Sequence, residues 1–270
     1  MSEWQTPKTD WSASQEQGVS GEDFNRIEGN IEYIYLYKIN LEIERGWIHD
    51  IENNRYRTVQ IGNQLWTMDN VVSTKYNDGT DIPIYGAGDW LEWKTLTTAG
   101  MCFYAGRRGS VQKIYGALYN WYVIDPSNPK NIAPDGWRVA TSADWEALEN
   151  YLIANGYNWD GTVSGNKIGR SLASETGWAS NETDGSVGKA IGLNNATGFS
   201  GQAAGYRDST EDSMAQWQTM TFRSRWWTPE SLSENGARWR GLDFNGPELI
   251  DSSYHKSTGA SIRLVKDVAP

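Results

Sequence analysis

The pattern of apolar and polar residues divides the chain into an N-terminal helical segment and a longer region of short strands. Residues 1–19 show no periodicity and are expected to form an extended arm. Ser20 is a suitable helix N-cap, with Asp23 three residues later. Apolar residues then follow at heptad-like spacing, interrupted at Lys38: Phe24, Ile27, Ile31, Ile34 and Leu41. This spacing predicts a helix that packs against its own domain or against other copies of the chain.

The helical pattern ends before residue 47, and a β-type pattern replaces it. Residues 56–66 alternate in the manner of a hairpin, with Gly62 and Asn63 at the turn. The sequence therefore predicts two parts: an arm and helix of residues 1–46, and a β-rich domain of residues 47–270.

One amphipathic helix is predicted inside the β-rich domain. Thr141 is a natural N-cap with Asp144 three residues on, and one helix face carries Trp145, Leu148 and Leu152. Residues 156–205 are rich in Gly and Asn and predict long ordered loops. Residues 260–265 predict the closing strand. The expected fold class is α+β, with short strands and long loops.

Composition adds two constraints on the partner. The chain has 15 Trp and 14 Tyr against 5 Phe, which favours aromatic rings that carry a polar atom and are typical of contact surfaces. The net charge is −10 and the isoelectric point is about 4.8. Phosphate binding needs clustered Lys and Arg, so nucleic acid is not expected as a partner.

The sequence also carries expectations about the cellular compartment. Its first residues lack a basic region followed by an apolar one, and no stretch approaches the length of a membrane span. Cys102 is the single cysteine, so no intrachain disulfide can form. We expect the chain to fold in a bacterial cytoplasm without a signal peptide and without inserting into a membrane.

Seven segments carry a likeness to a known family. They include Tyr115-Gly-Ala-Leu-Tyr-Asn-Trp121, and the others are residues 50–56, 59–71, 134–148, 198–200, 205–207 and 261–267. Together they resemble the Fibrobacter succinogenes major paralogous domain, a variant of the C-type lectin fold. The resemblance implies a C-type-lectin-like domain with a loop-rich face. The family often has cysteines where this chain has Ala133 and Leu264, and losing both together fits folding without oxidation.

The N-terminal segment carries a second, shorter likeness. Residues 4–11, followed by residues 22–30, resemble the openings of some phage virion and tail proteins. Joined to a lectin-like domain, this resemblance implies a tail receptor-binding protein of the type that diversity-generating retroelements mutate. In such targets the variable residues lie in the last part of the C-type-lectin fold.

The same resemblance places the binding surface in residues 222–258. In residues 238–245, strand alternation directs Leu242 and Phe244 to one face, which is expected to pack. The other face is expected to be displayed, with Trp239, Gly241, Asp243 and Asn245. Further contacts implied by the resemblance are Phe222, Ser224, Arg225, Ser252, Ser253, Tyr254 and His255. The alternative is that Trp226, Trp227 and Trp239 are core residues.

Enzymatic chemistry is not expected. The two histidines are His49 and His255, which leaves no base for a nucleophile and no His-rich metal shell. Cys102 stands alone and is expected to be a buried small hydrophobe. The calcium-dependent lectin motifs Glu-Pro-Asn or Gln-Pro-Asp, followed by Trp-Asn-Asp, do not occur. No cofactor and no metal are predicted.

These inferences converge on a phage tail receptor-binding protein in the virion. The lectin-like domain would bind a host cell-surface protein or glycan, while residues 1–46 would attach to other tail proteins and form a homotrimer. Weak single sites would then gain strength through avidity. Two alternatives stay open: a structural virion or cell-surface domain without a specific ligand, and a carbohydrate-processing enzyme.

Overall fold

The computed structural model describes most of the predicted β-rich domain, and the described residues are 30–31, 46–210 and 217–268. The chain divides into two units, Met1–Ile48 and His49–Pro270, and the fold below is that of the second. Asn30 and Ile31 are helical. The predicted arm, the remainder of the predicted helix and its proposed trimer contacts lie outside the described residues.

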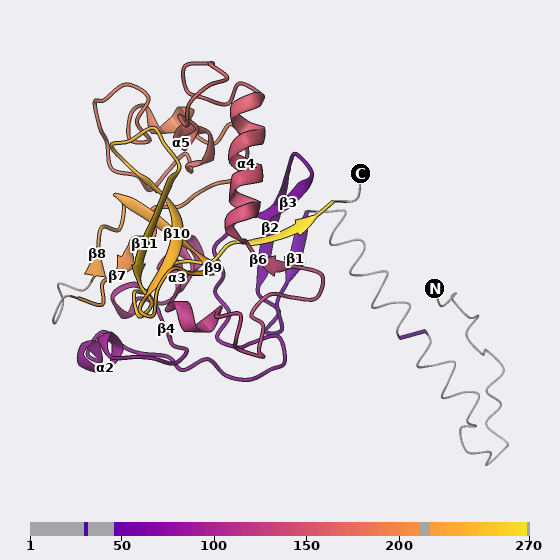
Figure 1. Ribbon diagram of the computed structural model, residues 1–270, viewed down its shortest axis with the longest axis vertical. Coiled ribbons are helices and arrows are strands. Elements are labelled where there is room, and N and C mark those ends of the chain that lie inside the picture. Colours follow the sequence, from indigo (N-terminus) through magenta and orange to yellow (C-terminus); the bar gives the residue numbers. More distant parts are fainter. Residues whose placement is uncertain (1–29, 32–45, 211–216, 269–270) are drawn as a thin grey trace, which may run out of the picture. The chain divides into compact units, whose positions relative to one another are not determined.

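The described chain contains short strands and few helices (Figure 1). The strands are β1 (Trp47–His49), β2 (Arg55–Ile61), β3 (Gln64–Thr67), β4 (Met101–Cys102), β5 (Leu118–Tyr119), β6 (Arg138–Val139), β7 (Tyr206–Arg207), β8 (Trp217–Gln218), β9 (Arg223–Ser231), β10 (Gly236–Asp243), β11 (Ile250–His255) and β12 (Leu264–Asp267). The helices are α2 (Trp90–Lys94), α3 (Ser110–Tyr115), α4 (Ser142–Ala154) and α5 (Gly169–Leu172), with 3-10 turns η1 (Tyr104–Gly106), η2 (Trp121–Val123) and η3 (Ile191–Leu193).

The strands of one sheet connect the two ends of the domain. β2 and β3 form the predicted hairpin, and Ile61 pairs with Gln64 across its turn. β12 then inserts between β3 and β6, antiparallel to both. The closing strand begins at Leu264, later than predicted, because Ala260 and Ser261 first bridge to β5 and β9. The C-terminal residues thus tie three parts of the domain together.

The one long described helix, α4, begins with the predicted capping box. The Thr141 hydroxyl accepts a hydrogen bond from the Asp144 N–H, and the Asp144 carboxylate accepts one from the Thr141 N–H. Trp145, Leu148 and Leu152 are buried on one helix face, as predicted. In Figure 1, α4 stands between the β2–β3 hairpin and the strands β9, β10 and β11.

Four rings from distant parts of the sequence form the centre of the core, the central aromatic cluster: Trp66, Trp145, Phe199 and Trp226. Trp145 stacks on Trp226 with ring centroids 5.4 Å apart and lies 4.8 Å from Trp66. Phe199 meets all three at 5.6–5.7 Å with its ring at a steep angle to theirs. Such offset and edge-to-face contacts are favourable beyond the area they bury.

A buried arginine secures this cluster. Arg263 is fully buried, and its guanidinium carbon lies 4.5 Å from the Phe199 ring centroid. It donates hydrogen bonds to the Asn70 and Gln202 side chains and to the carbonyls of Thr67, Phe199 and Ser200. Burial lowers the pKa of Arg263 to about 9, so the group is charged at neutral pH. The guanidinium is hydrogen-bonded to oxygens of two chain segments, residues 67–70 and 199–202.

The architecture is mixed, with helices beside sheets whose strand pairs are antiparallel. The α+β prediction is confirmed at that level. Cys102 is fully buried, as expected. None of the helices in the described segments combines the length and the apolar character that crossing a bilayer requires.

Candidate functional site

The predicted binding residues lie on and beside one antiparallel sheet, in which β10 lies between β9 and β11. Side chains alternate along each strand, so this sheet has two faces. We call the face that carries Trp226, Arg240 and Leu242 the inner face, and the face that carries Arg225 and Trp239 the outer face.

The inner face packs against the core and α4. Trp226 and Leu242 are fully buried in the core, and Phe244 packs against its edge. The packing predicted for Leu242 and Phe244 is therefore confirmed. Arg240, whose side chain is 3% exposed, forms ion pairs with Glu149 of α4 and, at 3.3 Å, with Asp251 of β11. This arginine joins the sheet to the helix.

The outer face carries a continuous stack of side chains. The Arg225 guanidinium carbon lies 4.2 Å from the Trp239 ring centroid. Trp239 stacks on Tyr254 at 4.9 Å, and Tyr254 stacks on Tyr206 at 5.2 Å. We call these four side chains the outer-face stack. Its members come from β9, β10, β11 and β7, so the stack connects the three-stranded sheet to β7 through ring contacts.

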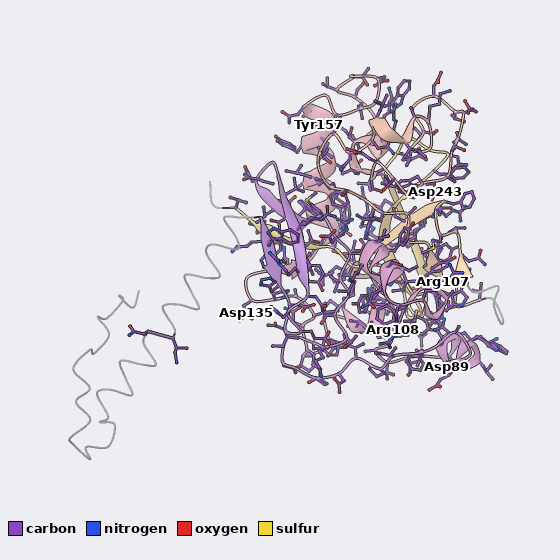
Figure 2. All side chains as sticks on the ribbon, turned by 180° about the vertical axis from the view of Figure 1, so that it is seen from behind. Asp89, Arg107, Arg108, Asp135, Tyr157 and Asp243 are labelled. Atoms are coloured by element: carbon purple, nitrogen blue, oxygen red, sulfur yellow. The ribbon has the colours of Figure 1, made fainter. Side chains whose placement is uncertain are left out.

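Arg225 is fixed at one end of this stack. Its Nη1 donates to the carbonyls of Ser224 and Leu242, and its Nη2 lies 2.6 Å from the carboxylate of Asp243. Arg223 approaches the same carboxylate at 3.5 Å. Asp243, labelled in Figure 2, therefore receives two cations on the half-buried margin of the sheet.

Five of the predicted contact residues are exposed: Phe222, Asn245, Ser252, Ser253 and His255. By strand alternation Ser252 lies on the outer face of β11, whereas Ser253 and His255 lie on its inner face. Ser252 pairs with Trp239, and Ser253 pairs with the neighbouring Arg238. Phe222 is 42% exposed and meets Phe244 edge to face at 4.9 Å. Tyr254 and Asp243 are half-buried. These seven side chains can meet a ligand directly.

The remaining four predicted contacts are buried, so the expectation that the whole face is displayed is wrong. Trp239 is 4% exposed because Arg225 and Tyr254 cover its ring. Ser224 and Arg225 are also buried. Gly241 leaves no room for a side chain, since a Cβ there would collide with the Ser224 carbonyl oxygen. These four residues lie beneath the exposed side chains and support their positions. Their role in ligand binding stays a prediction.

Trp226 and Trp227 are core residues, as the alternative interpretation of the sequence predicted. Both are fully buried. Their indole N–H groups donate to the Asn70 side chain at 2.9 Å and to the Tyr119 carbonyl at 2.8 Å. Their position beside the predicted contacts gave no sign of this, because it depends on segments more than 100 residues away.

A polar cavity of about 620 Å³ lies where α4 meets the inner side of β10 and β11. Sequence reasoning missed it, because its lining residues are scattered along the chain. The lining carries four carboxylates, two amides and one guanidinium, from Glu146, Glu149, Glu248, Asp251, Asn150, Asn166 and Arg240. Among the described residues, neither Glu146 nor Glu248 forms an ion pair. The cavity is thus rich in negative charge.

Two titratable groups beside the sheet, His255 and Tyr206, have defined surroundings. His255 Nδ1 lies 2.7 Å from the Ser257 hydroxyl, but Ser257 is fully buried and also donates to the Lys94 carbonyl. This hydroxyl cannot reach a substrate from that position. Burial, followed by the neighbouring Tyr254, raises the pKa of Tyr206 to about 12, so the phenol is neutral. In the parts of the chain that the structure describes, no group of three His, Cys, Asp or Glu residues could hold a metal ion.

Comparison with known proteins gives one match. A family model for the Fibrobacter succinogenes major domain matches residues 59–266, which include the central aromatic cluster, the cavity and the strands β9–β11. No curated protein and no solved structure among those compared matches the chain. Because the match spans most of the chain, the protein belongs to the Fibrobacter succinogenes major domain family.

Proposed function

We propose that this chain is a recognition protein, in which a C-type-lectin-like domain binds a host surface ligand as the receptor-binding protein of a phage tail. One observation carries the recognition role. The edge strand β11 carries exposed polar side chains on both faces, with Phe222 and Asn245 beside the sheet, and its Tyr254 belongs to the rigid stack of Arg225, Trp239, Tyr254 and Tyr206.

This arrangement suits ligand binding for a physical reason. Rigid aromatic and arginine side chains supply contact area at low entropic cost, while serine and asparagine adapt their hydrogen bonds to the partner. Ser252, Ser253 and His255 are exposed on one strand, so their identity can change without disturbing the core. A surface of this kind supports binding to many ligands from one scaffold.

The phage tail assignment draws on the resemblance of residues 4–11 and 22–30 to virion proteins. Attachment to other tail proteins through residues 1–46, and a homotrimer that supplies avidity, are part of the same proposal. The corresponding test is the solution mass of the full chain and of a chain that starts at residue 47, measured by light scattering. An oligomer that becomes a monomer on truncation supports the avidity model, and a monomer in both cases contradicts it.

The recognition role is tested by binding of the labelled full chain to intact bacterial cells and to a glycan array. The double variant Ser252→Glu/Ser253→Glu is expected to lose binding, because it places two charges on the contact surface. The matched control Thr97→Glu/Thr98→Glu changes two exposed hydroxyl residues outside β9–β11 and is expected to keep it. Equal binding by both variants contradicts the assignment of the surface. Absence of any binding favours the structural alternative, and turnover of a host polysaccharide favours an enzyme.

A further inference from the structure

The backbone of β11 is open on the side away from β10. In antiparallel pairs, successive residues direct their N–H and C=O groups alternately toward and away from a given neighbour. Phe244 donates to Phe222 of the β9 side, and Lys256 donates to Asn235 of the β10 side. Even-numbered residues of β10 therefore bond β9, and odd-numbered ones bond β11.

The register then identifies the outward groups. Trp239 pairs with Ser252 and Arg238 pairs with Ser253, so Ser252 bonds inward while Asp251 and Ser253 direct their backbone N–H and C=O groups outward. Among the described residues, no strand pairs with β11 on that side. The side chains of Asp251 and Ser253 are exposed as well. The strand thus offers unsatisfied donors and acceptors at the surface.

This edge lacks the usual protection. Natural edge strands are commonly blocked by proline, by outward lysine or by a bulge. β11 reads Ile-Asp-Ser-Ser-Tyr-His, with neither proline nor lysine, and its pairing with β10 is regular throughout. An unblocked edge of this kind can accept an additional strand through main-chain hydrogen bonds.

The acidic cavity lies beside the same edge. Ile250 and Asp251 of β11 line it, together with the carboxylates of Glu146 and Glu248. Side chains of an added strand lie next to those of the residues opposite them. A residue placed opposite Asp251 therefore projects on the inner side of the sheet, toward the cavity. Asp251 itself already pairs with Arg238 and Arg240, so a lysine or arginine there would meet the carboxylates of Glu146 and Glu248.

We propose that β11 is a docking edge for an extended peptide segment of a partner protein, with a lysine or arginine of that segment seated in the acidic cavity. The inference rests on the proposed recognition role and narrows its ligand from a protein or glycan to a protein strand. Main-chain bonds at Asp251 and Ser253 supply the common part of the affinity, and the cavity supplies selectivity for a basic side chain.

The test pans a displayed library of random nine-residue peptides against the immobilised full chain. Peptides that alternate β-branched residues and carry one Lys or Arg are expected to be enriched. For a synthesised peptide from this pool, Ser253→Pro is expected to weaken binding by about tenfold or more, whereas Ser253→Ala stays within about twofold. Glu146→Gln/Glu248→Gln is expected to weaken binding by about tenfold, and only for peptides that keep the basic residue.

A second measurement leaves the protein unchanged, in case Ser253→Pro fails to fold. Methylation of alternate peptide amides is expected to abolish binding in one register of methyl groups and to preserve it in the other. Enriched peptides that bind Ser253→Pro and both methylated forms equally well overturn the proposal. Binding to a glycan array that Ser253→Pro leaves intact, with no peptide enriched, overturns strand docking while the recognition role stands. Binding to no cell, glycan or peptide overturns both.

Discussion

The central aromatic cluster and the outer-face stack use the same kinds of side chain in opposite ways. In the cluster, Arg263 makes hydrogen bonds to two distant chain segments, and the Trp226 indole donates to Asn70. In the stack, the Trp239 Nε1 and the Arg225 Nε have no hydrogen-bond partner. In the cluster, the Trp145 Nε1 also lacks a partner, and the polar bonds come from Arg263 and Trp226. In the stack, the polar bonds come from Arg225, and the middle ring, Tyr254, is half-buried.

This difference predicts which substitutions change the stability of the domain and which change the proposed ligand binding. The cluster joins β3, α4, β9 and the loop at Phe199, so a change there reaches the whole core. One ring of the stack, Tyr254, lies on β11, which pairs with a single strand among those described. Changes to the exposed side chains of that strand should therefore alter binding more than folding.

The largest effect is expected from Arg263→Met. It removes the donors that satisfy buried carbonyl and amide oxygens, so the free energy of unfolding should fall by about 3–5 kcal/mol in urea denaturation. The matched control is Arg223→Met, which removes an arginine whose side chain is 39% exposed and lies 3.5 Å from Asp243. It should cost less than about 1 kcal/mol. Similar losses in the two variants would contradict the distinction between cluster and stack.

Tyr254→Ala should have the next largest effect on stability. It removes the middle ring of the stack, between Trp239 and Tyr206, and should lower the free energy of unfolding by about 1–2 kcal/mol. Tyr254→Phe keeps both ring contacts and should cost about 0.5 kcal/mol or less. The same urea titrations measure both, and an equal cost for the two would show that the hydroxyl matters more than the stacking.

The free energy of unfolding should depend on pH through the Asp144 carboxylate, which caps α4. Burial alone would raise the pKa of Asp144, but hydrogen bonds from Arg138 and Thr141 outweigh it, and the pKa is lowered. The stabilisation is therefore present at neutral pH and is lost as pH falls below the ordinary carboxyl pKa of about 4. Asp144→Asn should cost about 1 kcal/mol at pH 7. The gap between wild type and variant should narrow as the pH falls below about 4, and a gap that stays constant throughout the acid titration would exclude this linkage.

The smallest effect on stability is expected from Ser252→Ala/Ser253→Ala. Both side chains are exposed on β11, so the free energy of unfolding should change by less than about 0.5 kcal/mol. Binding to the ligand found in the cell or glycan assay should nevertheless weaken, because these hydroxyls lie on the proposed contact surface. Thr97→Ala/Thr98→Ala should change neither quantity. A large loss of stability in the serine variant would remove the distinction between edge and core.

The sequence by itself determined the local elements of this protein. The hairpin turn at Gly62 and Asn63 and the capping box of Thr141 and Asp144 depend on residues within a few positions of one another. Their backbone conformations follow from local sterics and hydrogen bonds, and the structure confirms both. The family could also be predicted from the sequence, because the segments that resemble it keep their order along the chain.

Only the tertiary structure decided which side chains reach the surface. Alternation correctly placed Trp239 and Gly241 on one face of the sheet. It did not predict that Arg225 and Tyr254 from neighbouring strands cover the Trp239 ring. The acidic cavity likewise joins Glu146 of α4 to Asp251 of β11, about a hundred positions away. The exposure of a side chain and the charge around it depend on the side chains that distant segments pack against it. Periodicity along one strand contains no information about these neighbours.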